Sequence, residues 1–106
     1  MPSERIIESD AFFSMLGLAM RAGQLTLGED GVRKAIASGK AEFVLLDAGA
    51  SANTTKMFTD SCAYYGVMLL TAQKDRLGLA IGKSGRMSAA VAKGPLAKKL
   101  LSLAQA

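Results

Sequence analysis

Apolar and polar positions along the chain follow two periods, and these predict most of its secondary structure. Two apolar runs of strand length, EFVLLD and VMLL, contain almost no polar position, which is typical of strands covered on both faces. Elsewhere apolar residues recur every three or four positions, as they do along the buried side of a helix. The pattern predicts helices at about 10–22, 28–38, 51–66, 74–81 and 94–103, and strands at about 24–27, 42–47, 67–70 and 87–92.

Residues that favour helix ends stand at these boundaries. The hydroxyls of Ser9 and Ser51 can cap the helices that follow them, and Pro95 suits a first helical turn. Gly23 and Gly66 can adopt the left-handed conformation that ends a helix. One helix followed by alternating strands and helices predicts an α/β fold, a three-layer α/β/α sandwich around a small and at least partly parallel sheet.

Composition narrows the class of protein. The chain has 106 residues, half of them hydrophobic, which suits one domain spanning residues 1–106. It has no histidine and a single cysteine, so we expect no transition-metal site, no internal disulfide and no cofactor. No apolar run reaches membrane length, and we expect a cytoplasmic protein.

Several methionines and residues of the third helix are predicted to face the core: Met15, Met20, Met57, Phe58, Cys62, Tyr65 and Met68.

Charge is distributed unevenly along the chain. Residues 1–53 carry five basic and seven acidic residues, whereas residues 54–106 carry eight basic and two acidic residues, a net charge of +6. A basic half of this kind attracts polyanions, of which nucleic acid is the commonest in a cytoplasm.

The segment GLAIGKSGR, residues 78–86, allows three interpretations. A nucleotide-binding phosphate loop requires four residues between its first glycine and Gly-Lys-Ser, but only three separate Gly78 from Gly82, so we reject it. A KH-type Gly-x-x-Gly loop joins two helices, whereas the MSAAVA that follows here favours a strand. What remains is a helix that ends at Gly82 before a flexible basic loop. Lys83 and Arg86 in this loop either contact phosphate or simply follow an ordinary glycine-ended helix.

Four segments together resemble the YlxQ-type bacterial members of the ribosomal protein L7Ae/L30e superfamily, which bind kink-turn RNA. They are GLAMRAGQLTLG, KAIASGKAEFVLLD, ASANTTK, and Arg76-Leu77-Gly78 leading to Ile81-Gly82. The resemblance extends from about Phe12 to Leu101. It implies an α/β/α sandwich with a four-stranded mixed sheet, and a non-catalytic protein that recognises structured ribosomal or regulatory RNA, either a kink-turn or a related internal loop.

The resemblance also implies where RNA would bind. In this family, the start of the helix after the first strand enters a widened groove, and the loop after the Leu-Gly-x-x-x-Gly helix covers flipped-out bases. The family's fold would place these two segments side by side. Transferred residue by residue, the predicted RNA-binding residues are Gly28, Glu29, Asp30, Gly31, Arg33 and Lys34, and then Ile81, Gly82, Lys83, Ser84, Gly85 and Arg86.

One pair of residues departs from the family pattern. The best-studied kink-turn binders carry Asn-Glu where this chain has Asp30-Gly31. An ionised Asp accepts hydrogen bonds but cannot donate them as Asn does, and Gly31 has no side chain. A competing hypothesis is therefore a protein-interaction adaptor on the same fold that has lost specific RNA recognition. With no evident nucleophile–base pair we expect no enzyme. We expect a monomer whose partner is structured RNA, with ribosome association left open.

Overall fold

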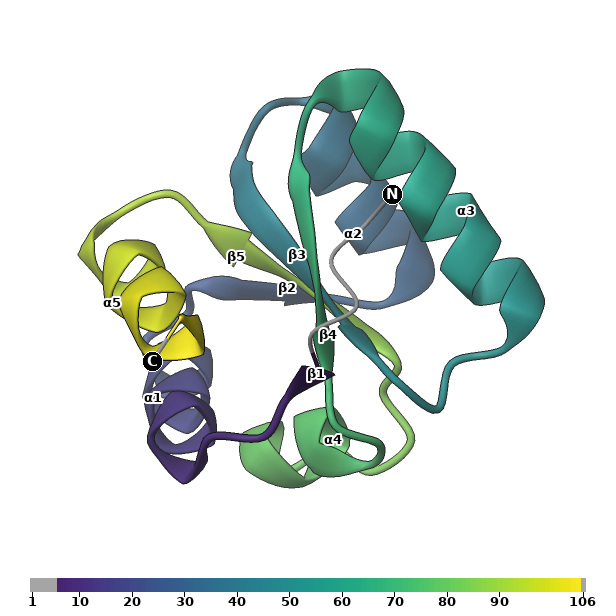
Figure 1. The fold of residues 1–106 in the computed structure, drawn as a ribbon. Coiled ribbons are helices and arrows are strands. Elements are labelled where there is room, and N and C mark those ends of the chain that lie inside the picture. Colours follow the sequence, from purple (N-terminus) through teal and green to yellow (C-terminus); the bar gives the residue numbers. More distant parts are fainter. Residues whose placement is uncertain (1–5, 106) are drawn as a thin grey trace.

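The computed structural model describes residues 6–105, which form a five-stranded sheet between two layers of helices (Figure 1). The strands lie in the order β1-β4-β3-β5-β2; β4 pairs in parallel with β1 and β3, and β5 pairs antiparallel with β3 and β2. The predicted three-layer sandwich with a mixed sheet is confirmed. The strands are β1 (Ile6–Ile7), β2 (Leu25–Leu27), β3 (Ala41–Asp47), β4 (Met68–Ala72) and β5 (Ser88–Ala92). The helices are α1 (Asp10–Arg21), α2 (Glu29–Ala37), α3 (Ala52–Tyr65), α4 (Arg76–Ile81) and α5 (Pro95–Ala104).

The expectation of four strands is corrected by β1. Its two residues, Ile6 and Ile7, pair with Thr71 and Ala72 at the outer edge of the sheet. A pairing of two residues is too short to produce a recognisable alternation of apolar and polar positions, so the sequence pattern could not predict it. The other four strands stand where the pattern predicted them, to within a few residues.

The central strand β3 divides the core into two parts. Phe43 and Leu45 pack with α1, α4 and α5 on one face of the sheet, whereas Val44 and Leu46 pack with α2 and α3 on the other. All four side chains are buried. This alternation explains why the four central residues of the run EFVLLD are all apolar, because each face of the strand is covered by helices.

The helix ends form largely as predicted. The Ser9 hydroxyl accepts a hydrogen bond from the Phe12 amide at 3.2 Å, and the Ser51 hydroxyl accepts one from the Thr54 amide at 3.1 Å. One boundary was wrong: α4 was expected to begin near residue 74. Asp75 has a left-handed backbone, φ 69°, so the helix begins after it.

Two residues predicted to face the core do not. Tyr65 is 49 % exposed at the end of α3, and Met68 is 48 % exposed at the start of β4. Cys62 is buried as predicted, and burial raises the pKa of its thiol to about 11.

In the part of the chain that the structure describes, no helix combines the length and the hydropathy needed to cross a membrane.

Candidate nucleic-acid interface

The first segment of the predicted site is the start of α2. Gly28 precedes the helix with φ 85°, a conformation that glycine adopts without strain, and no side chain caps the helix. The first amides of a helix have no partner within it, so this end offers N–H groups to an acceptor outside the protein. The side chains of Glu29 and Asp30 are exposed there. Gly31 is half-buried, and a Cβ added to it would lie 3.0 Å from Thr26 Cγ2.

The second segment is the loop between α4 and β5. Gly82 ends α4 in a left-handed conformation, and Gly85 has φ 82°. The loop folds back over α4, because the Lys83 amide donates a 2.9 Å hydrogen bond to the Gly78 carbonyl. A Cβ added to Gly78 would stand 2.8 Å from the Lys83 carbonyl oxygen, so only glycine allows this approach. Residues 82–86 are all exposed.

The structure brings the two segments together at one pocket of about 240 Å³. Gly28 and Glu29 line it from the α2 side, and Gly85 and Arg86 line it from the loop. The remaining residues of its lining were not among the predicted RNA-binding residues; they are Thr54, Phe58, Met87 and Ser88. Thr54 lies in the first turn of α3, within the segment ASANTTK that carries part of the resemblance, but that segment was not predicted to bind RNA.

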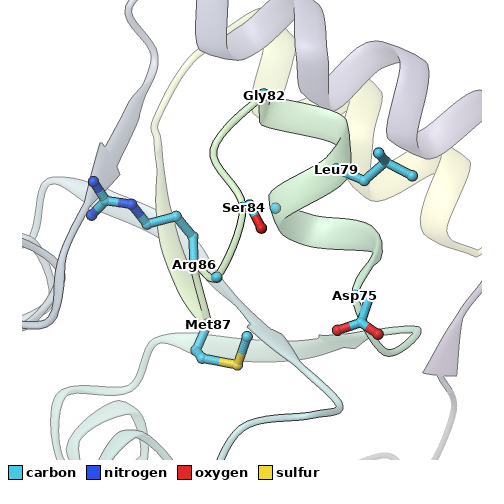
Figure 2. A pocket seen from close by; sticks show the side chains of 8 residues that line it. Asp75, Leu79, Gly82, Ser84, Arg86 and Met87 are labelled. Atoms are coloured by element: carbon cyan, nitrogen blue, oxygen red, sulfur yellow. The ribbon is translucent and has the colours of Figure 1, made fainter.

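A second pocket of about 420 Å³ lies beneath the loop. Figure 2 shows its lining: Ser84 and Met87 come from the loop, Asp75 precedes α4, and Leu79 lies on α4. Leu79 is 76 % exposed, although it is a large apolar residue. Its position could have been predicted, because it falls on the opposite side of the helix from the buried Leu77 and Ile81.

The remaining predicted residues occupy different surroundings. Asp30, Arg33 and Lys34 line a groove between α2 and α3. Lys83 is exposed in the loop. The Ile81 side chain is only 7 % exposed and packs in the core with α1 and α5, so it can influence the site only by fixing the loop.

A buried carboxylate anchors the turn that leads into α4. Asp47, at the end of β3, is 1 % exposed. Its Oδ2 accepts hydrogen bonds from the Gly49 amide at 2.8 Å and from the Asp75 amide at 3.2 Å. The carboxylate therefore joins the turn after β3 to the turn after β4. It stabilises the left-handed Asp75 from which α4 begins.

The Arg76 side chain is held by contacts within the protein and is not presented to solvent as a free cation. Its guanidinium lies 2.8 Å from Asp10 Oδ1 and donates to Gln73 Oε1 at 3.2 Å. It also lies over the Phe13 ring, 4.4 Å from the centroid. These contacts join the start of α4 to α1.

Between residues 6 and 105 the other ion pair is Lys56–Asp60, at 2.8 Å, which raises the pKa of Lys56 through the hydrogen bond to Asp60.

Comparison with known proteins places this arrangement in a family. Residues 10–102 match the model of the ribosomal protein L7Ae/L30e/S12e/Gadd45 family. The chain belongs to this family. Within the L7Ae family it is of the YlxQ type, because it is 44 % identical over 93 residues to a protein of Bacillus subtilis (strain 168) named RNA-binding protein YlxQ. That match covers 87 % of this chain and 93 % of the relative.

Other similar proteins extend the comparison. A protein of Enterococcus faecium, also named RNA-binding protein YlxQ, is 43 % identical over 54 residues, covering 51 % of this chain and 52 % of the relative. Among solved structures, a protein of unknown function from Bacillus halodurans C has a TM-score of 0.85 at 34 % identity, covering 92 % of this chain and all of that one. The Giardia lamblia 15.5kD RNA binding protein has a TM-score of 0.76 at 19 % identity, covering 93 % of this chain and 89 % of its own, which shows the shared fold.

Proposed function

We propose that this protein binds structured RNA through the surface formed by the start of α2 and the α4–β5 loop. The observation that carries the proposal is the pocket lined by Gly28 and Glu29 together with Gly85 and Arg86. Two segments that are distant in sequence form one surface there. It combines free helix amides, two glycines that permit close approach of the RNA, and an exposed guanidinium.

The charges around this surface suit RNA phosphates. Lys34, Lys83 and Arg86 are exposed, and none of them forms an ion pair within the described part of the chain. Figure 2 shows the Arg86 side chain projecting away from α4. Unpaired cations of this kind contact the phosphate backbone and make binding depend on salt. The Bacillus subtilis and Enterococcus faecium relatives are named RNA-binding proteins, and we extend that activity to this chain.

The acidic residues of the site favour an RNA with accessible base edges. Glu29 and Asp30 repel phosphate, but a carboxylate accepts hydrogen bonds from guanine N–H groups. Bases present such groups to a protein where the RNA is opened, in internal loops and bulges, rather than in a regular A-form duplex. The exposed Leu79 and the pocket beneath the loop could hold an unstacked base. We therefore propose a kink-turn or related internal loop of ribosomal or regulatory RNA, bound in the cytoplasm by the monomer.

The test compares a kink-turn RNA with a perfect duplex of equal length and charge. Wild-type protein should prefer the kink-turn. Replacing both Lys83 and Arg86 by Ala, or Lys34 alone by Ala, should weaken binding at least about tenfold, or about 1.4 kcal/mol. The double variant Lys98→Ala, Lys99→Ala is the matched control, because it removes the same charge from exposed positions on α5.

The outcomes separate two levels of the proposal. Equal affinity for the kink-turn and the duplex would refute kink-turn recognition but leave RNA binding in place. Absence of binding to any RNA would refute RNA binding and favour the protein-interaction adaptor. A loss in the Lys98, Lys99 control equal to that in the Lys83, Arg86 variant would show that net charge, rather than this surface, determines affinity.

A further inference from the structure

A groove of about 350 Å³ lies between α2 and α3, beside the proposed RNA-binding surface. The α2 residues in it stand at positions i, i+3, i+4 and i+7, so they form one stripe of the helix, and the two α3 residues are four apart. Its lining is Asp30, Arg33, Lys34 and Ala37 from α2, with Ser61 and Tyr65 from α3. Apart from the half-buried Ser61, all of these residues are exposed.

Tyr65 provides an aromatic surface in this groove. Its side chain is the last of α3 and remains 49 % exposed, because Gly66 turns the chain away in a left-handed conformation. The ring lies edge-to-face with that of Tyr64, which is 82 % exposed; the ring centres are 4.8 Å apart at an interplanar angle of 80°. A partly exposed ring can stack with a base, and such stacking tolerates any sequence.

The cations in the groove are available for a ligand. Arg33 and Lys34 form no ion pair with any described residue, and Asp30 is the one acidic residue in the lining. The groove therefore has a net charge of +1. The two cations can contact the phosphate of a nucleotide, and the aromatic ring beside them can stack on its base. A protein segment would instead require an apolar lining, which Ala37 and one tyrosine do not supply.

We propose that this groove binds an unpaired nucleotide in the strand that flanks the RNA's internal loop, with the base on Tyr65 and its phosphate near Arg33 and Lys34. This inference rests on the proposed function. The two sites are continuous, because Glu29 lines the pocket at the start of α2 and Asp30 to Ala37 line the groove along the same helix. Ser61 and Asp30 provide a hydroxyl and a carboxylate for polar atoms of the base.

The helix sets the length of RNA that is required. Glu29 and Ala37 are eight residues apart, which corresponds to about 12 Å at about 1.5 Å per residue. A stacked strand advances about 3.4 Å per nucleotide, so about three or four nucleotides span this distance. A single unpaired nucleotide next to the internal loop should not reach Tyr65, whereas six should.

The experiment measures the affinity of the full chain for three versions of one kink-turn RNA, with no flank, one unpaired nucleotide, or six. Each flank is placed in turn on either strand. The six-nucleotide flank should tighten wild-type binding about tenfold, and the one-nucleotide flank should not. Tyr65→Ala should remove the gain, whereas Tyr65→Phe, which keeps the ring, should retain it. Arg33→Gln should reduce it.

A second measurement places the contact directly. A 5-iodouridine in the six-nucleotide flank should crosslink to Tyr65 on irradiation, and peptide mass spectrometry identifies the residue. Equal affinity with and without the flank, or a crosslink on another surface, would overturn the groove proposal while leaving the primary site intact. If no version of the RNA binds, the proposed function itself fails. An unchanged unfolding midpoint for Tyr65→Ala excludes loss of fold as the cause.

Discussion

Replacing Gly78 by Ala tests whether close packing of the α4–β5 loop is needed for binding. Gly78 is buried in α4, and the loop backbone crosses directly over it. An added Cβ would lie 2.8 Å from the Lys83 carbonyl oxygen, 3.3 Å from the Gly85 nitrogen and 3.4 Å from the Ser84 Cα. Ordinary contact begins at 3.4 Å, so the loop must retreat by roughly 0.6 Å or the helix must shift.

Two free-energy terms oppose each other in this variant. Forcing a methyl group into a packed site costs about 1–3 kcal/mol, whereas Ala in place of a helical Gly contributes about 0.5–1 kcal/mol of stability. We expect a net loss of about 1–2 kcal/mol, which lowers the unfolding midpoint by roughly 5–15 °C in a domain of this size. If the loop relaxes instead, stability recovers but the loop is displaced from the pocket that it shares with α2.

The assay therefore has two readouts, thermal unfolding and affinity for the kink-turn RNA. Gly31→Ala is the matched control for unfolding, because it adds the same methyl group to a helix. Its nearest neighbour would be Thr26 Cγ2 at 3.0 Å, the end of a side chain that can rotate. Its stability should therefore fall less. If Gly78→Ala left both the midpoint and the affinity unchanged, the reasoning from close packing would be refuted.

Three further predictions concern other parts of the molecule. Asp47→Asn keeps an acceptor oxygen but removes the charge that the amides of Gly49 and Asp75 face, so denaturant unfolding should show a loss of about 1–3 kcal/mol. The double variant Asp30→Asn, Gly31→Glu leaves the net charge unchanged but should bind kink-turn RNA several-fold more tightly, because Asn both donates and accepts hydrogen bonds and Glu adds a base-directed acceptor; weaker binding in a titration would contradict this. Cys62, with its pKa raised to about 11, should have roughly one thiolate in a thousand at pH 8, so alkylation should be slow until denaturant is added. The pKa is raised only in the folded state, so the unfolded chain loses the Cys62 proton at lower pH than the folded protein does. The free energy of unfolding should therefore fall as the pH rises from about 9 to 11, and Cys62→Ser should lack this contribution.

The order of elements could be predicted from the sequence because the long elements have clear periods and clear ends. The run EFVLLD has helices on both faces, and the caps Ser9 and Ser51 form as expected. The strand β1 could not be predicted, because its two residues pair only through a distant strand. Tyr65 lies on the apolar stripe of α3 in a helical projection, but it stands at the last turn, beyond the neighbouring core.

The candidate site was only partly accessible to sequence reasoning. The glycines and cations of the α4–β5 loop were visible as a local pattern, and the resemblance paired that loop with the start of α2. Thr54 and Met87 line the shared pocket but were not predicted to belong to the site, because their position depends on how α3 and β5 pack. The groove that Tyr65 shares with Arg33 likewise arises from the packing of α2 against α3.

The position of β5 in the sheet has a consequence for the order in which the protein can become functional. β5 lies between β3 and β2, so the strand that leads into α2 has no neighbour in the sheet until residues 88–92 have been synthesised. The Gly28 end of α2 and the Arg86 loop can meet only after that strand is inserted. We therefore expect a nascent chain to remain unable to bind RNA until β5 has left the ribosome, and a fragment ending before β5 to be incompetent as well. Recognition of RNA in this protein would then also report that synthesis has passed β5.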